Sequence, residues 1–450
     1  MMTTMTTMKN PPSPKMWPYK RTFMKFYLIS LGCPKNLTNS EEFSARLIAN
    51  GHKMVFSPEK ADTVLINTCG FIASAVKEAK EEIRYALELK EAGKIKKVAV
   101  TGCLVERYRE QLAKEFPGID TLFSIGSQQT VEKTIKQKGV FLDPLPSKLY
   151  LPEYKMTLTA PHTAYLKVAD GCNNRCAYCT IPFIRGNYIS KPMNDIVREA
   201  RLLVQTGVKE ISLIAQDTTS YGMDLYGKPQ LVPLLEKLLK IRGLGRLRIM
   251  YGYPHRVTKE LAQLMASTDK IFHYIDIPLQ HIADPVLKRM NRHCDGAQIR
   301  RTLDMLKAEV SDISLRTNFI VGFPGETKKD FNELKKFVKD YEFDNMGVFE
   351  YFREKGTTAY AMEQVPAKVK HERAAELVET QSRVIDKINK RLIGTVVEAI
   401  ADGPDFGRTY KDAPDIDGKV TFTRPVEVGS IFKARMIAAD GYERELEPID

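Results

Sequence analysis

This sequence of 450 residues has no hydrophobic run long enough to cross a membrane. A bilayer span needs about 20 consecutive apolar residues. The longest apolar stretches, such as VLINTCGFIASAV at residues 64–76, are shorter and are interrupted by polar side chains. The first residues also lack the apolar segment of a signal peptide. We therefore expect a cytoplasmic protein with no membrane partner.

Cysteine is scarce as well, with seven residues in the whole chain. An odd number at this low density excludes a small secreted scaffold held by disulfides, so thiolate ligands or free thiols are expected instead. Hydrophobic residues make up 43% and charged residues 28% of the chain, which is the composition of an ordinary globular protein. A chain of this length usually folds as about three domains.

The net charge of +12 is unevenly distributed. Residues 1–25 hold five basic and no acidic side chains, whereas residues 391–450 hold eight Lys or Arg against twelve Asp or Glu, a net charge of about −4. A module that grips nucleic acid needs surplus cations, so the C-terminal region is predicted to recognise a basic protein. Asp412, Asp415 and Asp417 would then steer that partner, unless they form a simple solvated loop.

Three strand-like segments near the N-terminus each end in a cysteine. Residues 1–24 come first and show no apolar periodicity, so a flexible extension is predicted there. The segments KFYLISLGC, ADTVLINTCG and IKKVAVTGCL alternate with helical patterns, which predicts a parallel sheet within residues 25–140. Because parallel strands end at one edge of a sheet, Cys33, Cys69 and Cys103 are expected to converge. The alternative is that they are small buried hydrophobic residues.

A proline-bearing linker at residues 141–157 precedes six further strand candidates. Helical patterns separate most of these strands, so an α/β partial barrel is predicted over residues 158–388, with its reactive face at the carboxyl ends of the strands. Short strands with Gly, Asp and Pro turns in residues 389–450 predict a small antiparallel β-barrel. The candidate strands of the partial barrel are residues 164–170, 210–217, 247–252, 273–280, 314–323 and 345–352.

Three cysteines lie at Cys-x-x-x-Cys-x-x-Cys spacing in the loop DGCNNRCAYCTIPFIRG, which follows the first barrel strand. A structural zinc site needs four ligands, and no fourth Cys or His lies in this loop. A four-iron cluster held by three thiolates keeps one iron free for a substrate or cofactor. Cys172, Cys176 and Cys179 are therefore predicted to hold such a cluster, with a zinc site completed by the distant His162 as the alternative.

The sequence GCNNRCAYC resembles the signature of radical S-adenosylmethionine enzymes, with Tyr178 at the usual aromatic position. In that family the open iron binds the amino and carboxylate groups of S-adenosylmethionine. Two further segments resemble its cofactor contacts, namely AQD at residues 215–217 and FIVGFPGE at residues 319–326. The resemblance implies that the cofactor is contacted by Tyr178, Gln216, Asp217, Gly322 and Glu326.

The three regions together resemble the methylthiotransferases, whose last domain is a TRAM barrel. In that family the N-terminal cysteines, here Cys33, Cys69 and Cys103, hold a second 4Fe-4S cluster that carries the sulfur. LISLGCPKN, NTCGFI and LIAQDTTSYG are similar to the branch that modifies an aspartate of small-subunit ribosomal protein twelve. The tRNA-modifying branch more often reads GCQMN and NTCSVR at the first two places, which makes tRNA an unlikely partner.

The resemblance also implies a reaction. An electron from a flavodoxin- or ferredoxin-type donor cleaves S-adenosylmethionine, and the 5′-deoxyadenosyl radical removes hydrogen from the aspartate β-carbon. The carbon radical takes methylsulfide from the second cluster, and another S-adenosylmethionine supplies the methyl group. Two other functions stay open from the residues: a tRNA methylthiotransferase, and a non-catalytic iron–sulfur or zinc protein that binds ribosomes.

Four conspicuous residues have two interpretations each. Cys294 lies outside both sets of cysteines and is expected to be a free thiol rather than a ligand. His255 and His281 follow strands, so they either line the pocket or serve as hydrogen-bonded structural histidines. Arg185 either meets an acidic substrate or forms a surface ion pair.

Overall fold

The computed structural model describes residues 24–149, 151–152 and 154–449, which form two compact units. The first unit is the chain up to residue 146 together with residues 152–160, and the second comprises residues 147–151 and 161–450. The predicted N-terminal extension lies outside the described residues except for Met24. Within the described part of the chain, no helix is both long enough and apolar enough to cross a bilayer.

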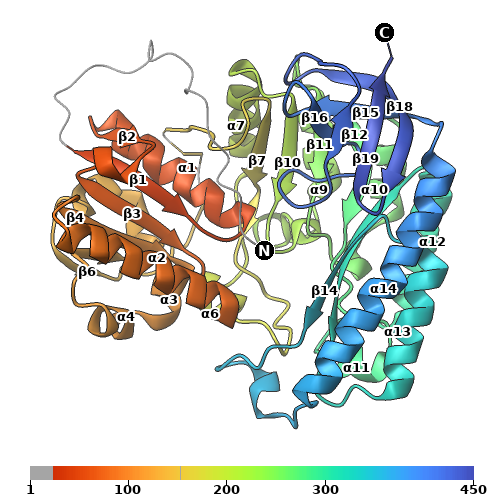
Figure 1. The fold of residues 1–450 in the computed structure, drawn as a ribbon, viewed down its shortest axis with the longest axis horizontal. Helices are drawn as coiled ribbons and strands as arrows, with labels where there is room; N and C mark the ends of the chain where they lie inside the picture. The colour runs from red at the N-terminus through yellow and green to blue at the C-terminus, as the bar shows by residue number, and fades with distance from the viewer. Residues whose placement is uncertain (1–23, 150, 153, 450) are drawn as a thin grey trace. The chain divides into compact units, whose positions relative to one another are not determined.

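The first unit is a parallel sheet (Figure 1), and apolar side chains form a core on each of its faces. Its strands run in the order β2 (Lys53–Val55), β1 (Lys25–Ser30), β3 (Thr63–Thr68), β4 (Lys97–Gly102), β5 (Thr121–Phe123) and β6 (Gly139–Phe141), and all neighbours are parallel. Val64 and Ile66 pack into one core and Leu65 into the other, as the two-residue period of a strand requires. Sequence reading found β1, β3 and β4; the other three strands have only three residues each, too few for a recognisable pattern.

Helices cover both faces of this sheet. Ala79 and Ile83 of the helix after β3 belong to one core, and Phe43 and Leu47 of the helix after β1 belong to the other. The helices are α1 (Pro34–Ala49), α2 (Ala73–Glu91), α3 (Cys103–Tyr108), α4 (Glu110–Glu115) and α5 (Val131–Thr134), with short 3₁₀ turns η1 (Pro58–Lys60) and η2 (Gly126–Thr130). Strand-helix alternation with short connections therefore produces the predicted open sheet.

The second unit begins with the predicted partial barrel, and the prediction of six parallel strands is confirmed. The sheet order is β7 (Thr163–Lys167), β10 (Glu210–Ile214), β11 (Arg246–Ile249), β12 (Ile271–Asp276), β13 (Ser314–Val321) and β14 (Asn345–Glu350). All neighbouring pairs are parallel. A small ribbon of β8 (Ala169–Asp170) and β9 (Ile189–Ser190) brackets the cysteine loop after β7.

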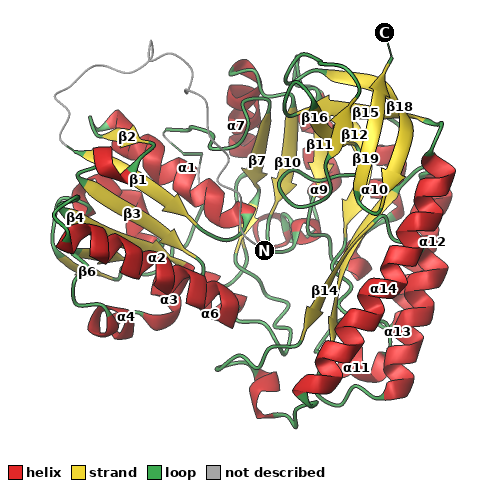
Figure 2. Ribbon diagram, in the orientation of Figure 1, coloured by secondary structure: helices red, strands yellow, loops and turns green. Residues whose placement is uncertain are grey.

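Helices flank the barrel strands (Figure 2). One large apolar core joins them to the sheet, and Leu213, Leu247 and Ile275 are fully buried in it. The helices are α6 (Ile181–Arg185), α7 (Met193–Gln205), α8 (Met223–Tyr226), α9 (Leu231–Leu239), α10 (Lys259–Ala266), α11 (Asp284–Arg289), α12 (Gly296–Glu309), α13 (Lys328–Tyr341) and α14 (Ala367–Leu392), with 3₁₀ turns η3 (Thr218–Ser220), η4 (Pro254–Arg256) and η5 (Thr358–Ala361).

A closed five-stranded barrel follows α14, as predicted. Its strand order is β15 (Val396–Ala401), β16 (Phe406–Thr409), β17 (Val420–Phe422), β19 (Glu443–Pro448) and β18 (Ile431–Asp440). The pairing departs from the antiparallel prediction at one place, because β17 and β19 are parallel while the other pairs are antiparallel. Val397, Ala434 and Leu446 pack inside it. Closure leaves no unpaired strand edge, which lets so small a barrel persist as a separate module.

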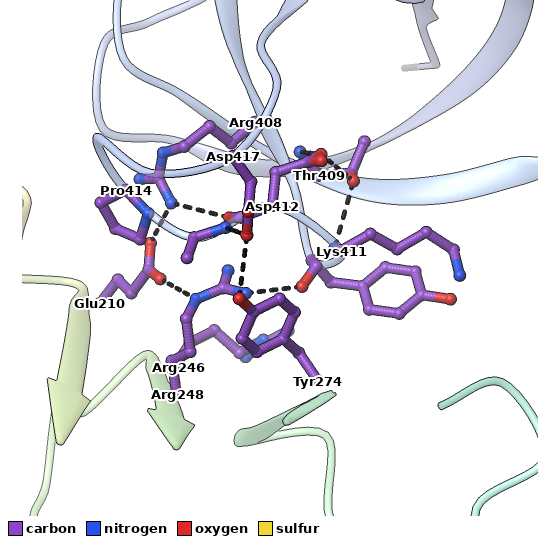
Figure 3. Close-up of polar contacts among 12 residues, drawn as sticks. Glu210, Arg246, Arg248, Tyr274, Arg408, Thr409, Lys411, Asp412, Pro414 and Asp417 are labelled. Atoms are coloured by element: carbon purple, nitrogen blue, oxygen red, sulfur yellow. Dashed lines mark hydrogen bonds and ion pairs between the residues drawn. The ribbon is translucent and has the colours of Figure 1, made fainter. Parts of the chain in front are cut away.

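Residues 408–417 of the small barrel, which we call the cap segment, bond to one side chain from each of the six strands of the partial barrel. Figure 3 shows the contacts of Glu210, Arg248 and Tyr274. Glu210 and Asn345 are the first residues of their strands, so the cap segment lies at the amino-terminal end of the partial barrel, opposite the cysteine loop after β7. The six side chains are Tyr165, Glu210, Arg248, Tyr274, Arg316 and Asn345.

This attachment corrects one sequence-based expectation. Asp412 and Asp417 are not exposed steering residues, because Asp412 is fully buried and the Asp417 side chain is only 5% exposed. Asp412 pairs with Arg444 at 3.1 Å, and Asp417 accepts hydrogen bonds from Tyr274 and Arg316 at 2.9 Å each. The net charge of residues 391–450 does not show that these carboxylates are paired with buried cations in the fold. Asp415 alone of the three is exposed.

Candidate functional site

The loop that carries Cys172, Cys176 and Cys179, which we call the loop trio, is shaped by backbone constraints. Gly171 has a φ of +76°, and a Cβ at this position would lie 2.1 Å from the Asn187 carbonyl oxygen, so only glycine fits. The Cys172 amide donates to Gly186 O at 3.1 Å, and the Cys179 amide donates to Cys176 O at 3.0 Å. The loop is therefore folded back on itself directly after β7.

Asp170 anchors the start of this loop. Its carboxylate accepts hydrogen bonds from Gln216 Nε2 at 2.8 Å and from the Gly171 amide at 3.0 Å, and it pairs with Arg185 at 3.3 Å. Burial by itself would raise the pKa of Asp170, but the Arg185 and Lys167 cations and these hydrogen bonds lower it to about 2. The carboxylate thus stays ionised and ties the cysteine loop to the end of β10.

The thiols of the loop trio have the chemistry of soft-metal ligands. Burial raises the pKa of the Cys172 and Cys179 thiols, and the neighbouring Cys176 raises both further. A thiol with a raised pKa is a poor nucleophile, whereas metal coordination removes its proton outright. Within the described residues, no three His, Cys, Asp or Glu side chains converge on a point that would hold a single metal ion. Three thiolates in one loop are the ligand type and number with which a four-iron cluster keeps one iron free.

Gln216 and Asp217 lie just beyond the end of β10 and differ in whether their side-chain oxygens are free to accept a hydrogen bond from a ligand. Asp217 is buried and accepts hydrogen bonds from Asn174 at 2.9 Å, Arg256 at 2.7 Å and the η3 turn, so protein donors occupy its oxygens. Gln216 donates to Asp170, but among the described residues no donor reaches its buried Oε1. An N–H group of a ligand could therefore bond to Gln216, while Asp217 holds the cysteine loop through Asn174.

Tyr178 connects the cysteine loop with the end of β13. Its ring packs edge-to-face against Phe323, with centroids 6.4 Å apart. Gly322 has a φ of +68°, and a Cβ there would lie 2.4 Å from Lys370 Cγ. Glu326 is buried; it accepts a hydrogen bond from the Gly322 amide at 2.8 Å and pairs with Arg373 at 2.7 Å. The two sequence motifs thus meet at the carboxyl end of the barrel.

Arg292 brings a cation to the loop trio. Its guanidinium lies 3.7 Å from Cys176 Sγ, donates to Pro278 O at 2.7 Å and stacks 4.0 Å from the centroid of the Tyr253 ring. His293, the next residue, lies 3.0 Å from Asn174 O through Nε2. A fixed positive charge beside thiolates stabilises their ionised form.

Cys33, Cys69 and Cys103, which we call the N-terminal trio, follow three adjacent parallel strands. Cys33 caps α1 after β1, Cys69 follows β3, and Cys103 begins α3 after β4. Each is next to a glycine in the sequence, and these glycines let the loops touch. A Cβ on Gly32 would lie 3.0 Å from Cys69 Sγ, and a Cβ on Gly70 would lie 2.9 Å from the Cys103 carbonyl carbon. The predicted convergence of the three cysteines at one sheet edge is therefore present.

Two buried asparagines brace this edge. Asn36 Nδ2 donates to Leu31 O at 2.7 Å, and Asn67 Nδ2 donates to Asn36 O at 2.9 Å. Asn67 also reaches Ser40 Oγ at 2.7 Å. Side chains from α1 and β3 thereby fix the loops after β1 and β3.

Comparison with known families gives three matches along the chain. Residues 25–124 match a family described as uncharacterized protein family UPF0004, residues 166–338 match the radical SAM superfamily, and residues 391–446 match the TRAM domain. Among curated proteins, ribosomal protein uS12 methylthiotransferase RimO of Elusimicrobium minutum is 49% identical over 423 residues, or 93% of this chain and 98% of that protein. The protein of the same name from Carboxydothermus hydrogenoformans is 41% identical over 439 residues, or 95% of this chain and 100% of that protein.

The chain belongs to the uS12 methylthiotransferase family. As a member of this family it is a radical SAM enzyme, and the superfamily brings with it a 4Fe-4S cluster and S-adenosylmethionine.

Solved structures show the same fold at low sequence identity. The radical S-adenosylmethionine methyltransferase TsrM from Kitasatospora setae has a TM-score of 0.54 at 14% identity, covering 74% of this chain and 76% of that chain. The cobalamin-dependent S-adenosylmethionine radical enzyme OxsB has a TM-score of 0.53 at 12% identity, covering 81% of this chain and 56% of that chain. Likeness at this level describes the fold of the chain and nothing about its substrate.

Several individual expectations can be compared with the structure. His162 precedes β7 and bonds to Asp402 at 2.8 Å, so it lies at the other end of the strand from the loop trio, and a zinc site that includes it is excluded. Arg185 is neither a surface residue nor free for a substrate, because it is buried against Asp170. Burial lowers the pKa of His255 to about 4, which keeps its ring neutral. Cys294 is buried in the apolar core of the partial barrel.

His281 is also buried. Its Nδ1 accepts a hydrogen bond from the Ala283 amide at 3.0 Å. This nitrogen therefore has a structural role. Its Nε2 lies 3.6 Å from Glu326, a contact longer than a hydrogen bond.

Sequence reasoning missed Asp170, Asn174, Arg256 and Arg292. Asp170 and Asn174 lie within the cysteine loop DGCNNRCAYCTIPFIRG. They were missed because the sequence argument considered only the metal-binding cysteines of that loop. Arg292 lies in MNRHCDG, a segment that sequence reasoning set aside because its cysteine had no partner. The usable signal was positional: Arg256 lies in the connection after β11 and Arg292 in the connection after β12, and such connections begin at the reactive face.

Proposed function

We propose that this protein adds a methylthio group to the β-carbon of an aspartate in small-subunit ribosomal protein uS12. The observation that carries the proposal is the pair of cysteine trios, each placed after the carboxyl ends of parallel strands, in a chain that uS12 methylthiotransferases match almost from end to end. The proposed functional regions are residues 25–140, residues 158–388 and residues 389–450, joined by a linker at residues 141–157.

The loop trio would hold the radical SAM cluster through Cys172, Cys176 and Cys179, leaving one iron for S-adenosylmethionine. When bound, this cluster supplies the electron that cleaves S-adenosylmethionine into a hydrogen-abstracting radical. The open acceptor Gln216 Oε1 is suited to the amino group of the cofactor. Tyr178, Gly322 and Glu326 line the same end of the barrel and are proposed to complete the cofactor site.

Asp217 has a supporting part in this proposal. Its oxygens accept hydrogen bonds from Asn174, Arg256 and the η3 turn. Asp217 therefore orients the cysteine loop and does not bind the cofactor directly. Arg292 places its positive charge at Cys176 and would draw electron density from that sulfur. Both residues act by fixing what surrounds the reacting centre, which is the protein's usual contribution in a cofactor enzyme.

The N-terminal trio is proposed to hold a second 4Fe-4S cluster, which carries the sulfur that is transferred. Three features support this: the shared sheet edge, the glycines that let the cysteine loops touch, and the start of the 16-residue helix α1 at Cys33. A helix N-terminus favours negative charge such as that of a thiolate. The first unit would thus supply sulfur, and the second unit would generate the substrate radical.

The chemistry of the substrate explains the need for a radical. The β-carbon of aspartate is attached to a carboxylate, which neither acidifies its C–H bonds strongly nor provides a leaving group. Polar thiolation is therefore slow, and hydrogen abstraction opens the position. We further propose that the electron comes from a flavodoxin- or ferredoxin-type donor, and that tRNA is not a substrate.

The decisive experiment offers both substrate classes side by side. The reconstituted protein, S-adenosylmethionine and a reductant are incubated with uS12 or with total tRNA, and mass spectrometry detects an added methylthio group. We expect the addition on one aspartate of uS12 together with 5′-deoxyadenosine. A methylthio group found on tRNA alone would show that the protein modifies tRNA instead. If no 5′-deoxyadenosine forms, the protein is a non-catalytic binding protein.

A further inference from the structure

A groove between α7 and α9, on the outside of the partial barrel, is lined mostly by cationic residues. Four of its six lining residues are Arg or Lys, and none is acidic. The lining residues are Asn194, Val197, Arg198, Arg201, Lys237 and Lys240. We call this surface the basic groove. It takes no part in the site described above.

Folding removes one acidic residue of α7 from this surface, and the exposed Glu236 of α9 is not among its lining residues. Glu199 of α7 turns inward and pairs with the buried Lys191 at 2.6 Å. Arg198 has only a loose contact with Asp195, 3.7 Å away and partly exposed to solvent. In the described part of the chain, Arg201, Lys237 and Lys240 form no ion pair within 4.0 Å. All four cations of the basic groove are exposed.

The spacing of these cations concentrates the charge. Arg198 and Arg201 are three residues apart on one helix, as are Lys237 and Lys240 at the end of the other, so each pair shares a helix face. Like charges at this spacing destabilise a helix. The helix dipole offsets this for Lys240, which caps the C-terminus of α9, but not for Arg198 in the middle of α7. An anion in the groove would relieve the repulsion.

We propose that the basic groove binds the phosphate backbone of ribosomal RNA, and that the enzyme therefore prefers uS12 within the small subunit to the free protein. This inference rests on the proposed function. A basic ribosomal protein would be repelled by this surface, whereas RNA carries a regular series of phosphates. Guanidinium groups match phosphate oxygens with two parallel hydrogen bonds, and Lys contributes point charge.

The test compares two charge-matched variants of the full-length, reconstituted protein. The groove variant is Arg198→Gln, Arg201→Gln, Lys237→Gln and Lys240→Gln. The control variant removes the same charge from exposed residues of α13 and α14, as Lys328→Gln, Lys329→Gln, Lys339→Gln and Lys390→Gln. Binding to purified small subunits is measured over a series of KCl concentrations, and methylthiolation is measured for both free uS12 and intact subunits.

We expect the groove variant to bind small subunits at least about tenfold more weakly. The slope of log affinity against log KCl concentration should be shallower by about three, as expected for the loss of its phosphate contacts. It should modify free uS12 at the wild-type rate, and the control variant should bind subunits like the wild type. Unchanged affinity and salt dependence in the groove variant would overturn the inference, as would an equal loss in the control variant. If the wild type modifies neither form of uS12, the proposed function fails, while the binding measurement still decides the role of the basic groove.

Discussion

The guanidinium of Arg292 is held on three sides. The Tyr253 ring stacks on it, Pro278 O accepts its hydrogen bond, and Cys176 Sγ lies 3.7 Å away. A cation fixed this close to a cluster sulfur stabilises the more negative, reduced state of the cluster. The residue therefore has an electronic effect that can be separated from a structural one.

Replacing Arg292 with Gln is expected to lower the reduction potential of the cluster on the loop trio and to slow 5′-deoxyadenosine formation. Potentiometric titration followed by electron paramagnetic resonance measures the potential directly. Arg300→Gln is the control, because Arg300 pairs with Glu333 at the surface, 3.2 Å away. Arg292→Lys should restore part of the potential, and a wild-type potential in Arg292→Gln would contradict the electronic role.

Asp402 provides a pH-dependent contribution to stability. It bonds to His162 at 2.8 Å and to Arg408 at 2.7 Å. Burial by itself would raise the pKa of Asp402, but the His162 hydrogen bond and the Arg408 cation lower it to about 2. Because the folded pKa lies below the unfolded value near 4, the ionised carboxylate adds about 2 kcal/mol that is present above about pH 4 and is lost as the pH falls toward about 2.

Asp402→Asn should therefore be less stable than the wild type at neutral pH, and the gap should close as the solution is acidified. Urea unfolding of the apoprotein at several pH values measures the gap. Asp405→Asn, at an exposed position of the same small barrel, serves as the control. A gap that stays constant down to about pH 3 would show that Asp402 contributes by shape and not by charge.

At the scale of elements, the cap segment joins two modules that the sequence presents as separate. Glu210 of β10 lies between Arg248 of β11 at 2.7 Å and Arg408 of the small barrel at 2.8 Å, and all three side chains are buried. Arg248 is also stacked 4.5 Å from the rings of both Phe272 and Tyr274. The small barrel is thus fixed to the partial barrel by charges that water does not screen.

Glu210→Gln should leave the buried Arg248 without its carboxylate partner, while Arg408 keeps Asp402, and should cost about 3–5 kcal/mol. We expect a clear drop in the melting temperature of the apoprotein and faster proteolytic removal of the small barrel after α14. Glu236→Gln, at an exposed position of α9, should change neither measurement. Equal melting temperatures and equal proteolysis for the two variants would show that the cap segment is not what holds the small barrel in place.

At the scale of the whole molecule, each compact unit contains one complete cysteine trio. The N-terminal trio belongs to the open sheet and the loop trio to the partial barrel, so the two sites can be disabled independently. This separation makes the proposed division of labour testable without disturbing the rest of the protein.

Changing the loop trio to Ala should abolish 5′-deoxyadenosine formation while leaving about four iron atoms per chain on the N-terminal trio. The reciprocal triple change should keep radical formation and lose the methylthio product, because the sulfur source is gone. Iron analysis and product chromatography measure both outcomes. Methylthiolated uS12 from the N-terminal triple variant would disprove the sulfur-carrying role.

The sequence alone determined the features that depend on short-range patterns. Most of the longer strands and helices such as α2 and α12 follow from local periodicity, so the parallel strands and a small β-barrel were predictable. The loop trio spans eight residues, so its spacing was visible without a structure. The N-terminal trio needed one further rule, that parallel strands end at a common edge.

Only the tertiary structure decided which charges face each other. Arg292 lies 116 residues from Cys176, and Arg408 lies 198 residues from Glu210, so no local pattern pairs them. Composition counted Asp412 and Asp417 as surface charge, although folding buries both against Arg444 and Arg316. Burial and ion pairing depend on the positions of distant segments in space, and a charge count along the chain holds no information about those positions.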